Sequence, residues 1–119
     1  MGSGGSRSII SANTREGAYG GGHERLRDDL RTYSNSYYEH IDKIKKDPYD
    51  RYNVSGWANQ CRHFAAKAFE TGCKLLDQGA KIDLSEGGSV LKKADHVDLQ
   101  KLYSQRLAEL ERFERDARG

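Results

Sequence analysis

The feature that most constrains the fold is an apolar stripe at helical spacing that ends just before the chain's single proline. Its members follow one another at steps of three or four residues: Leu26, Leu30, Tyr33, Tyr37, Ile41 and Ile44. That spacing places them on one face of an α-helix. Pro48 disfavours helical backbone at Asp47. The sequence therefore predicts a helix over about residues 24–46, whose apolar face must pack against another element.

Two further segments carry stripes of the same kind. The second helix is predicted to start between Trp57 and Gln60 and to end near Gln78, or to stop at Gly72 and be followed by a second short piece over residues 73–78. It follows a connector over residues 49–56, in which residues 52–54 are a candidate for a short extended piece. Its expected buried side consists of Trp57, Cys61, Phe64, Ala65, Ala68 and Phe69. The third helix is predicted to begin between Ser89 and Asp95, with Asp95 as its N-cap. Its stripe consists of Leu99, Leu102, Tyr103, Leu107, Leu110 and Phe113.

Signals for β-structure are few and short. Ile9 with Ile10, and Ile82 with Leu84, are candidates for brief strands. We therefore expect a mainly α fold with three principal helices and at most a small, short-stranded β element, a three-helix bundle being its simplest version. Residues 1–22 hold seven of the 13 glycines and are expected to be a flexible Gly/Ser-rich segment, followed by a single small helical domain over residues 23–119.

Composition narrows the classes of function. Leu, Ile, Val and Phe make up 21 of 119 residues, which is a thin core, although seven tyrosines and one tryptophan add apolar area. The net charge of +2 gives no electrostatic argument for nucleic acid as a partner. No apolar run is long enough to span a membrane. The basic residues of the last segment alternate with acidic ones and are interpreted as a solvated helix face: Arg106, Arg112, Arg115 and Arg118.

Cysteine and histidine usage argues against a disulfide and against a metal site. Cys61 and Cys73, if on one helix, lie about 18 Å apart along its axis, too far for a bridge. A reducing, cytoplasmic compartment is therefore the default expectation, with export lacking a cleaved signal peptide left open. Cys61, His63 and Cys73 lack the paired spacing of zinc ligands. We expect neither a metal nor another cofactor.

One motif carries possible chemistry. Cys61 is predicted to lie at or near the N-terminus of the second helix, where the helix dipole stabilises a thiolate and lowers the pKa of the thiol. A thiolate is the attacking species in nucleophilic catalysis. The alternative interpretation is that Cys61 is a small buried residue on an apolar face, which is common for free cysteine.

The residues around Cys61 resemble the nucleophile helix of papain-superfamily Cys/His amidohydrolases, such as CHAP and NlpC-type amidases and lecithin-retinol-acyltransferase-like enzymes. The matching positions are Gln60, Cys61, Phe64, Ala65, Phe69 and Gly72, and Tyr52-Asn53 resembles the lead-in of effector and toxin relatives. The resemblance covers about 20 residues. It implies a cysteine amidase, peptidase or acyltransferase in which a histidine, carried on a strand of an antiparallel sheet, acts as general base.

The resemblance leaves the partners of Cys61 open. His96 follows Cys61 in the chain, His23 precedes it, and His40 is a third candidate if the first two helices pack together. His63 lies two residues from Cys61, where side chains of a helix do not face each other. Asn59, Asp95 or Asp98 is the candidate orienting residue.

A second hypothesis needs no catalysis. The apolar stripes are equally consistent with a helical module that binds a protein or peptide-like partner or associates with itself, with Cys61 buried and an apolar patch exposed on one helix. The sequence alone leaves open whether the chain is an enzyme.

Overall fold

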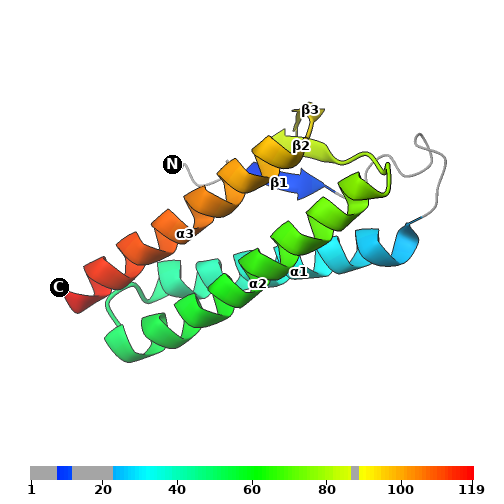
Figure 1. Ribbon diagram of the computed structural model, residues 1–119. Coiled ribbons are helices and arrows are strands. Elements are labelled where there is room, and N and C mark those ends of the chain that lie inside the picture. Colours follow the sequence, from blue (N-terminus) through cyan, green and yellow to red (C-terminus); the bar gives the residue numbers. More distant parts are fainter. Residues whose placement is uncertain (1–7, 12–22, 87–88) are drawn as a thin grey trace.

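The computed structural model describes residues 8–11, 23–86 and 89–119 of the chain, and these form three long helices with a small sheet at one end (Figure 1). The helices are α1 (Glu24–Lys46), α2 (Arg51–Asp77) and α3 (His96–Arg118). The strands are β1 (Ser8–Ser11), β2 (Asp83–Glu86) and β3 (Ser89–Lys93). The expected fold class, mainly α with a short-stranded β element, is confirmed. The remaining parts of the predicted flexible segment, residues 1–7 and 12–22, lie outside the described residues.

Helix α1 has the predicted bounds but buries a slightly different face. Its buried positions follow a strict alternation of three and four residues: Arg27, Leu30, Ser34, Tyr37, Ile41 and Ile44. Leu26 and Tyr33, which the apolar pattern assigned to the stripe, are only half-buried at its edge. Two polar residues, Arg27 and Ser34, therefore occupy core positions of this helix.

Helix α2 begins earlier than the sequence predicts. Asp50 is its N-cap and accepts a hydrogen bond from the backbone N–H of Asn53 at 3.1 Å. Residues 51–56 are helical, so the predicted connector is reduced to the turn after Lys46 and the extended piece over residues 52–54 does not form. The Asp50 side chain replaces the backbone hydrogen bonds that a helix start lacks, and this cap outweighs Gly56.

The buried face of α2 is a seam of mostly small side chains. Its members are again spaced by four and three residues: Val54, Ala58, Cys61, Ala65, Ala68, Gly72 and Leu75, with Thr71 beside them. Trp57, Phe64 and Phe69, expected in the core, pack at its edges and are half-buried. This alternation is the knobs-into-holes pattern of helices that cross at a shallow angle. Small residues let both neighbouring helices approach α2 closely.

Helix α3 starts as predicted, at Asp95. The Asp95 carboxylate accepts from the N–H of Asp98, and the Asp98 carboxylate accepts from the N–H of Asp95, which completes a capping box. Near this start, Leu99 packs over Gly72 so closely that a Cβ there would lie 2.9 Å from Leu99 Cδ1. Helices α2 and α3 therefore meet at a glycine.

Helix α2 lies between α1 and α3. Both neighbours pack along it, whereas the backbones of α1 and α3 approach each other at few positions. The turn at residues 47–50 joins the end of α1 to the start of α2, and His96 at the start of α3 contacts Asp77 at the end of α2. Helices α1 and α3 are therefore parallel to each other and antiparallel to α2.

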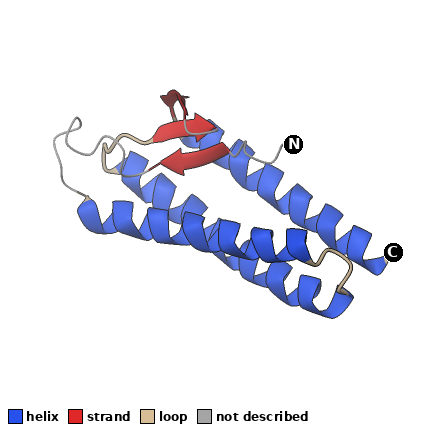
Figure 2. Cartoon of the chain, turned by 180° about the vertical axis from the view of Figure 1, so that it is seen from behind, coloured by secondary structure: helices blue, strands red, loops and turns tan. Residues whose placement is uncertain are grey.

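The sheet lies where α2 ends and α3 begins (Figure 2). It is antiparallel with the order β1-β2-β3, and a register shift between Leu84 and Ser85 bends the pairing of β2 with β3. Ile82, just before β2, is fully buried in the core cluster formed with Leu30, Leu75 and Leu99. The predicted strand at Ile9 and Ile10 pairs with Ser85 and Leu84. The sheet thus closes one end of the helical core.

Candidate functional site

Cys61 lies well inside α2 rather than at its N-terminus. The helix begins at Arg51, so Cys61 is about 15 Å further along the axis. The stabilisation of anions by a helix dipole falls off within the first turn. The predicted placement of Cys61 at a helix N-terminus is therefore wrong, because the cap at Asp50 starts the helix earlier.

The Cys61 thiol is buried and hydrogen-bonded. Its side chain is 0% exposed, and Sγ donates a hydrogen bond to the backbone carbonyl of Tyr37 at 3.6 Å. Burial, followed by the negative charge of Glu109, raises the pKa of the thiol to about 12. At neutral pH the group is a protonated thiol. It occupies one of the small positions of the seam, between Ala58 and Ala65.

His96 and His23 lie far from Cys61. His96 Nε2 is 2.8 Å from Asp77 Oδ1, and Asp77 follows Cys61 on the same helix by about 24 Å of axial rise. His23 is the N-cap residue of α1 and lies about 21 Å along that helix from Tyr37, the neighbour of Cys61. The structure does not bring either of these histidines to the sulfur.

The other two histidines flank Phe64 rather than Cys61. The His40 ring lies 5.5 Å from the Phe64 ring, and its Nδ1 is 2.8 Å from the carbonyl oxygen of Ser36. The His63 ring lies 5.3 Å from the Phe64 ring, and His63 is exposed. Asn59 is exposed, and its Oδ1 accepts a hydrogen bond from Arg62 at 3.0 Å. The hydrogen bond of the Cys61 sulfur goes to Tyr37 and to no histidine, and none of the three described strands carries a histidine.

Arg106 is buried, so its predicted position on a solvated face is wrong. It was expected on a solvated face, but its side chain is only 6% exposed. Its guanidinium carbon lies 4.6 Å from the centre of the Tyr37 ring and 5.4 Å from that of Tyr38, which places the cation over two aromatic faces. Arg106 Nε and Nη2 are buried and have no hydrogen-bond partner within the described ranges. Arg112, Arg115 and Arg118 are exposed as predicted.

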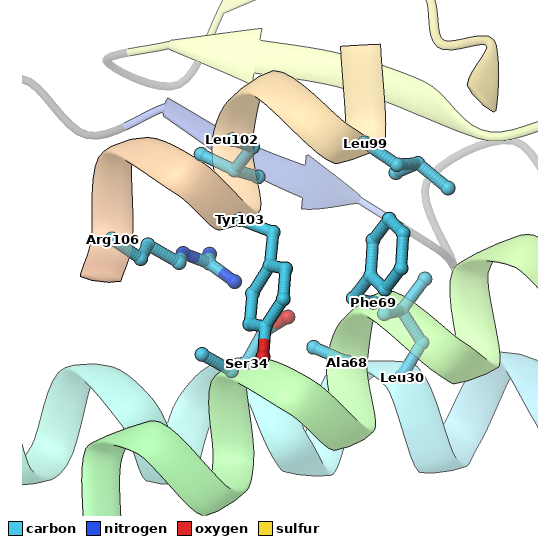
Figure 3. A pocket seen from close by; sticks show the side chains of 9 residues that line it. Leu30, Ser34, Ala68, Phe69, Leu99, Leu102, Tyr103 and Arg106 are labelled. Carbon is cyan, nitrogen blue, oxygen red and sulfur yellow. The ribbon is translucent and has the colours of Figure 1, made fainter. Parts of the chain in front are cut away.

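The polar environment of Arg106 is shared with Ser34 of α1. Both residues line a cavity of about 10 Å³ between the helices, together with Leu102, Tyr103 and Ala68 (Figure 3). Ser34 Oγ is also buried without a partner in the part of the chain that the structure describes. Buried polar groups that lack partners are destabilising, and a native fold retains few of them.

A groove of about 440 Å³ runs over the same region on the outside, between α1 and α3. Its apolar lining comes from Tyr38, Ile41, Leu102 and Ala108. Its charged and polar lining is Lys45, Gln105, Arg106, Glu109 and Arg112. Arg106 thus faces both the inner cavity and this groove.

The single carboxylate of the groove is occupied by neighbours other than Arg106. Glu109 Oε1 accepts a hydrogen bond from the Tyr37 hydroxyl at 3.5 Å, and Glu109 Oε2 lies 3.7 Å from the Arg112 guanidinium. Burial and the charge of Glu109 raise the pKa of Tyr37 well above its ordinary value, so its hydroxyl stays protonated and can donate. No carboxylate of the described residues lies within ion-pair distance of Arg106.

The spacing of α3 contained a signal for Arg106. The buried residues Leu99, Leu102, Arg106 and Leu110 follow one another by three or four positions, so Arg106 is in line with the apolar stripe. A charge at a stripe position indicates a buried charge. Arg106 was nevertheless assigned to the solvated face, because acidic and basic residues alternate over residues 109–118 just after it.

Comparisons with models of protein families, with curated proteins and with solved structures found no match to this chain. Among the described residues, no group of three or more histidine, cysteine or acidic side chains is arranged to hold a metal ion. No described helix combines the length and the hydropathy needed to cross a bilayer. The candidate site is the groove between α1 and α3, with Arg106 in its lining.

Proposed function

We propose that the chain is a non-catalytic helical module that binds a protein partner in the groove between α1 and α3. The observation that carries this proposal is the arrangement of the helices, in which α1 and α3 both pack on α2 and leave an open groove of about 440 Å³ between them. A groove between parallel helices with mixed apolar and polar lining is suited to one further amphipathic helix.

The geometry around Cys61 favours this function over catalysis. A nucleophilic cysteine needs a lowered thiol pKa and a base within hydrogen-bond reach. The pKa of Cys61 is raised, its Sγ already donates to Tyr37, and His96 and His40 form their hydrogen bonds with other residues. The cysteine amidase, peptidase or acyltransferase activity implied by the motif, in an effector or toxin setting, has no such support.

A second exposed surface lies at the α1–α2 turn and has to be distinguished from the groove. Tyr49 and Tyr52 are 78% and 87% exposed, and Tyr52 borders a shallow hollow along the first turns of α2. Two exposed aromatic side chains three residues apart form a smaller surface than the groove. The experiment below therefore includes a variant at Tyr52.

The test is selection of helical peptides from a displayed library against the folded chain. The library keeps helix-forming residues and an apolar stripe and varies the remaining positions. Peptides that bind should lose affinity about tenfold or more for Ala108→Tyr, which fills the groove, because a bulky side chain excludes the helix. Gln100→Tyr, on the exposed side of α3 outside the groove, is the matched control and should bind normally.

Two results would overturn the proposal. One is that no helical peptide is selected above background. The other is that binding is lost for Tyr52→Ala and unchanged for Ala108→Tyr, which would place the interaction at the α1–α2 turn.

A further inference from the structure

Resting on the proposed function, we infer that Arg106 is an anchor for a carboxylate, and that the occupant of the groove is an acidic amphipathic helix of a partner protein. The inference starts from the state of the guanidinium. Arg106 is 6% exposed, lines the groove, and has two buried nitrogens, Nε and Nη2, without partners among the described residues. A buried cation with free donors is costly unless a counter-charge reaches it.

The two tyrosines of α1 fix the orientation of Arg106. Its guanidinium lies over the Tyr37 and Tyr38 rings, at 4.6 and 5.4 Å from their centres. The two rings are nearly perpendicular to each other, so the cation is held in the corner between them, and this attraction to the rings restricts the side chain without a hydrogen-bond acceptor. The unpaired Nε and Nη2 lie on one edge of the guanidinium, and a carboxylate offers the planar, bidentate acceptor that matches this edge once it displaces the side chains that shield the two nitrogens from solvent.

The charges of the groove select an acidic ligand. Lys45, Arg106 and Arg112 line it with a single carboxylate, Glu109, which is engaged by Tyr37 and Arg112. This excess of positive charge also argues against a second copy of the chain that would lay the same face against this one, because like charges would meet.

The size of the groove fixes the length of the ligand. Its lining on α3 runs from Leu102 to Arg112, which corresponds to about 15 Å of helix. A helical segment of roughly two to three turns fills that length. Apolar side chains of the ligand would face Tyr38, Ile41 and Leu102, and an Asp or Glu in the same row would face Arg106.

The experiment compares selection from the same peptide library on the wild-type chain and on Arg106→Gln. We expect peptides selected on the wild type to share an Asp or Glu at one register position, and those selected on Arg106→Gln to lack it. The probe for affinity is the most enriched wild-type peptide and its Glu→Gln (or Asp→Asn) counterpart. The protein variant alone, or the peptide variant alone, should raise Kd about tenfold. The two changes together should raise Kd little more than either one, because both remove the same interaction between Arg106 and the carboxylate of the peptide.

Two control variants distinguish loss of the Arg106 anchor from a general loss of positive charge and from a loss of folding. Lys74→Gln removes an exposed positive charge of α2 outside the groove and should leave Kd unchanged at physiological salt. Arg106→Met should keep the helical fold, with an unchanged or higher melting temperature in the free protein, because it removes the buried unpaired charge. It should bind the acidic peptide as weakly as Arg106→Gln.

The outcomes distinguish this inference from the proposed function. Peptides that bind in the groove without an acidic preference, or equally to Arg106→Gln, overturn the anchor and leave the interaction module standing. Self-association of the wild type that competes with the peptide would identify a second copy as the occupant and overturn the acidic helix. Failure to select any peptide overturns both.

Discussion

Cys61 Sγ donates its hydrogen bond to the backbone carbonyl oxygen of Tyr37 across the α1–α2 interface, at 3.6 Å. The contact joins a small position in the seam of α2 to the most deeply buried tyrosine of α1. Together with the burial of the thiol, this contact gives a physical reason to expect low reactivity at a cysteine with a nucleophile-like sequence context. The sulfur instead takes part in the packing of α1 against α2.

Alkylation of Cys61 tests this role directly. In a Cys73→Ser background, the native protein should react with iodoacetamide at about pH 8 at least tenfold more slowly than the same protein unfolded in urea, since reaction requires local opening. His96→Ala and His23→Ala should leave the rate unchanged. Rapid alkylation below pH 8 that depends on either histidine would contradict the buried role.

The alkaline limb of the stability curve should also depend on Cys61. Burial raises the pKa of this thiol in the folded protein to about 12, above its ordinary value of 9.0. The folded state therefore holds the proton more tightly, and this contribution to stability is complete below about pH 9 and is lost as the pH rises towards 12.

Cys61→Ala removes this linkage, so its free energy of unfolding should fall less steeply between about pH 9 and 11 than that of the wild type. Urea unfolding at several pH values measures the slope. Cys73→Ala is the control, because that half-buried thiol carries a smaller shift in the same direction. Parallel slopes for all three proteins would contradict the assignment.

Gly72 and Gly56, both on α2, should respond oppositely to alanine. A Cβ at Gly72 would lie 2.9 Å from Leu99 Cδ1, whereas nothing lies within 4 Å of one at Gly56. Gly56→Ala should raise the free energy of unfolding by about 0.5–1 kcal/mol through helix propensity.

Gly72→Ala gains the same propensity but forces Leu99 away from the seam, which costs about 1–3 kcal/mol. Its free energy of unfolding should therefore lie below that of Gly56→Ala by at least about 1 kcal/mol. Equal stabilisation of both variants in chemical denaturation would show that the α2–α3 contact is not tight at Gly72.

The capping box at the start of α3 gives a further prediction. Asp95→Ala removes the acceptor for the N–H of Asp98 and should lower the free energy of unfolding by about 0.5–2 kcal/mol. Asp95→Asn, which can still accept that hydrogen bond, should recover most of the loss. Asp116→Ala, an exposed position near the other end of α3, is the control and should change stability by less than about 0.5 kcal/mol. If Asp95→Ala were as stable as the wild type, the cap would not contribute.

Local chemistry in the sequence was sufficient for much of the fold. The stripe ending at Pro48 determined α1, and Asp95 with Asp98 determined the start of α3. Two short apolar pairs, Ile9 with Ile10 and Ile82 with Leu84, located β1 and β2, whereas β3 was not predicted. These signals act between residues close in the chain, so they are visible without tertiary structure. The predicted start of α2 was too late, because the N-cap at Asp50 begins the helix before Gly56.

Two positions depended on the tertiary structure. Cys61 became a packing residue because the two neighbouring helices close over the seam of α2, and the same burial that excludes water raises the pKa of its thiol. Arg106 is a buried cation because the rings of Tyr37 and Tyr38 on α1 pack against its guanidinium. The sequence by itself determined which segments are helices and which faces are apolar. Only the packing of α1 and α3 on α2 decided which polar groups lose water, since desolvation depends on neighbours that are distant in the chain.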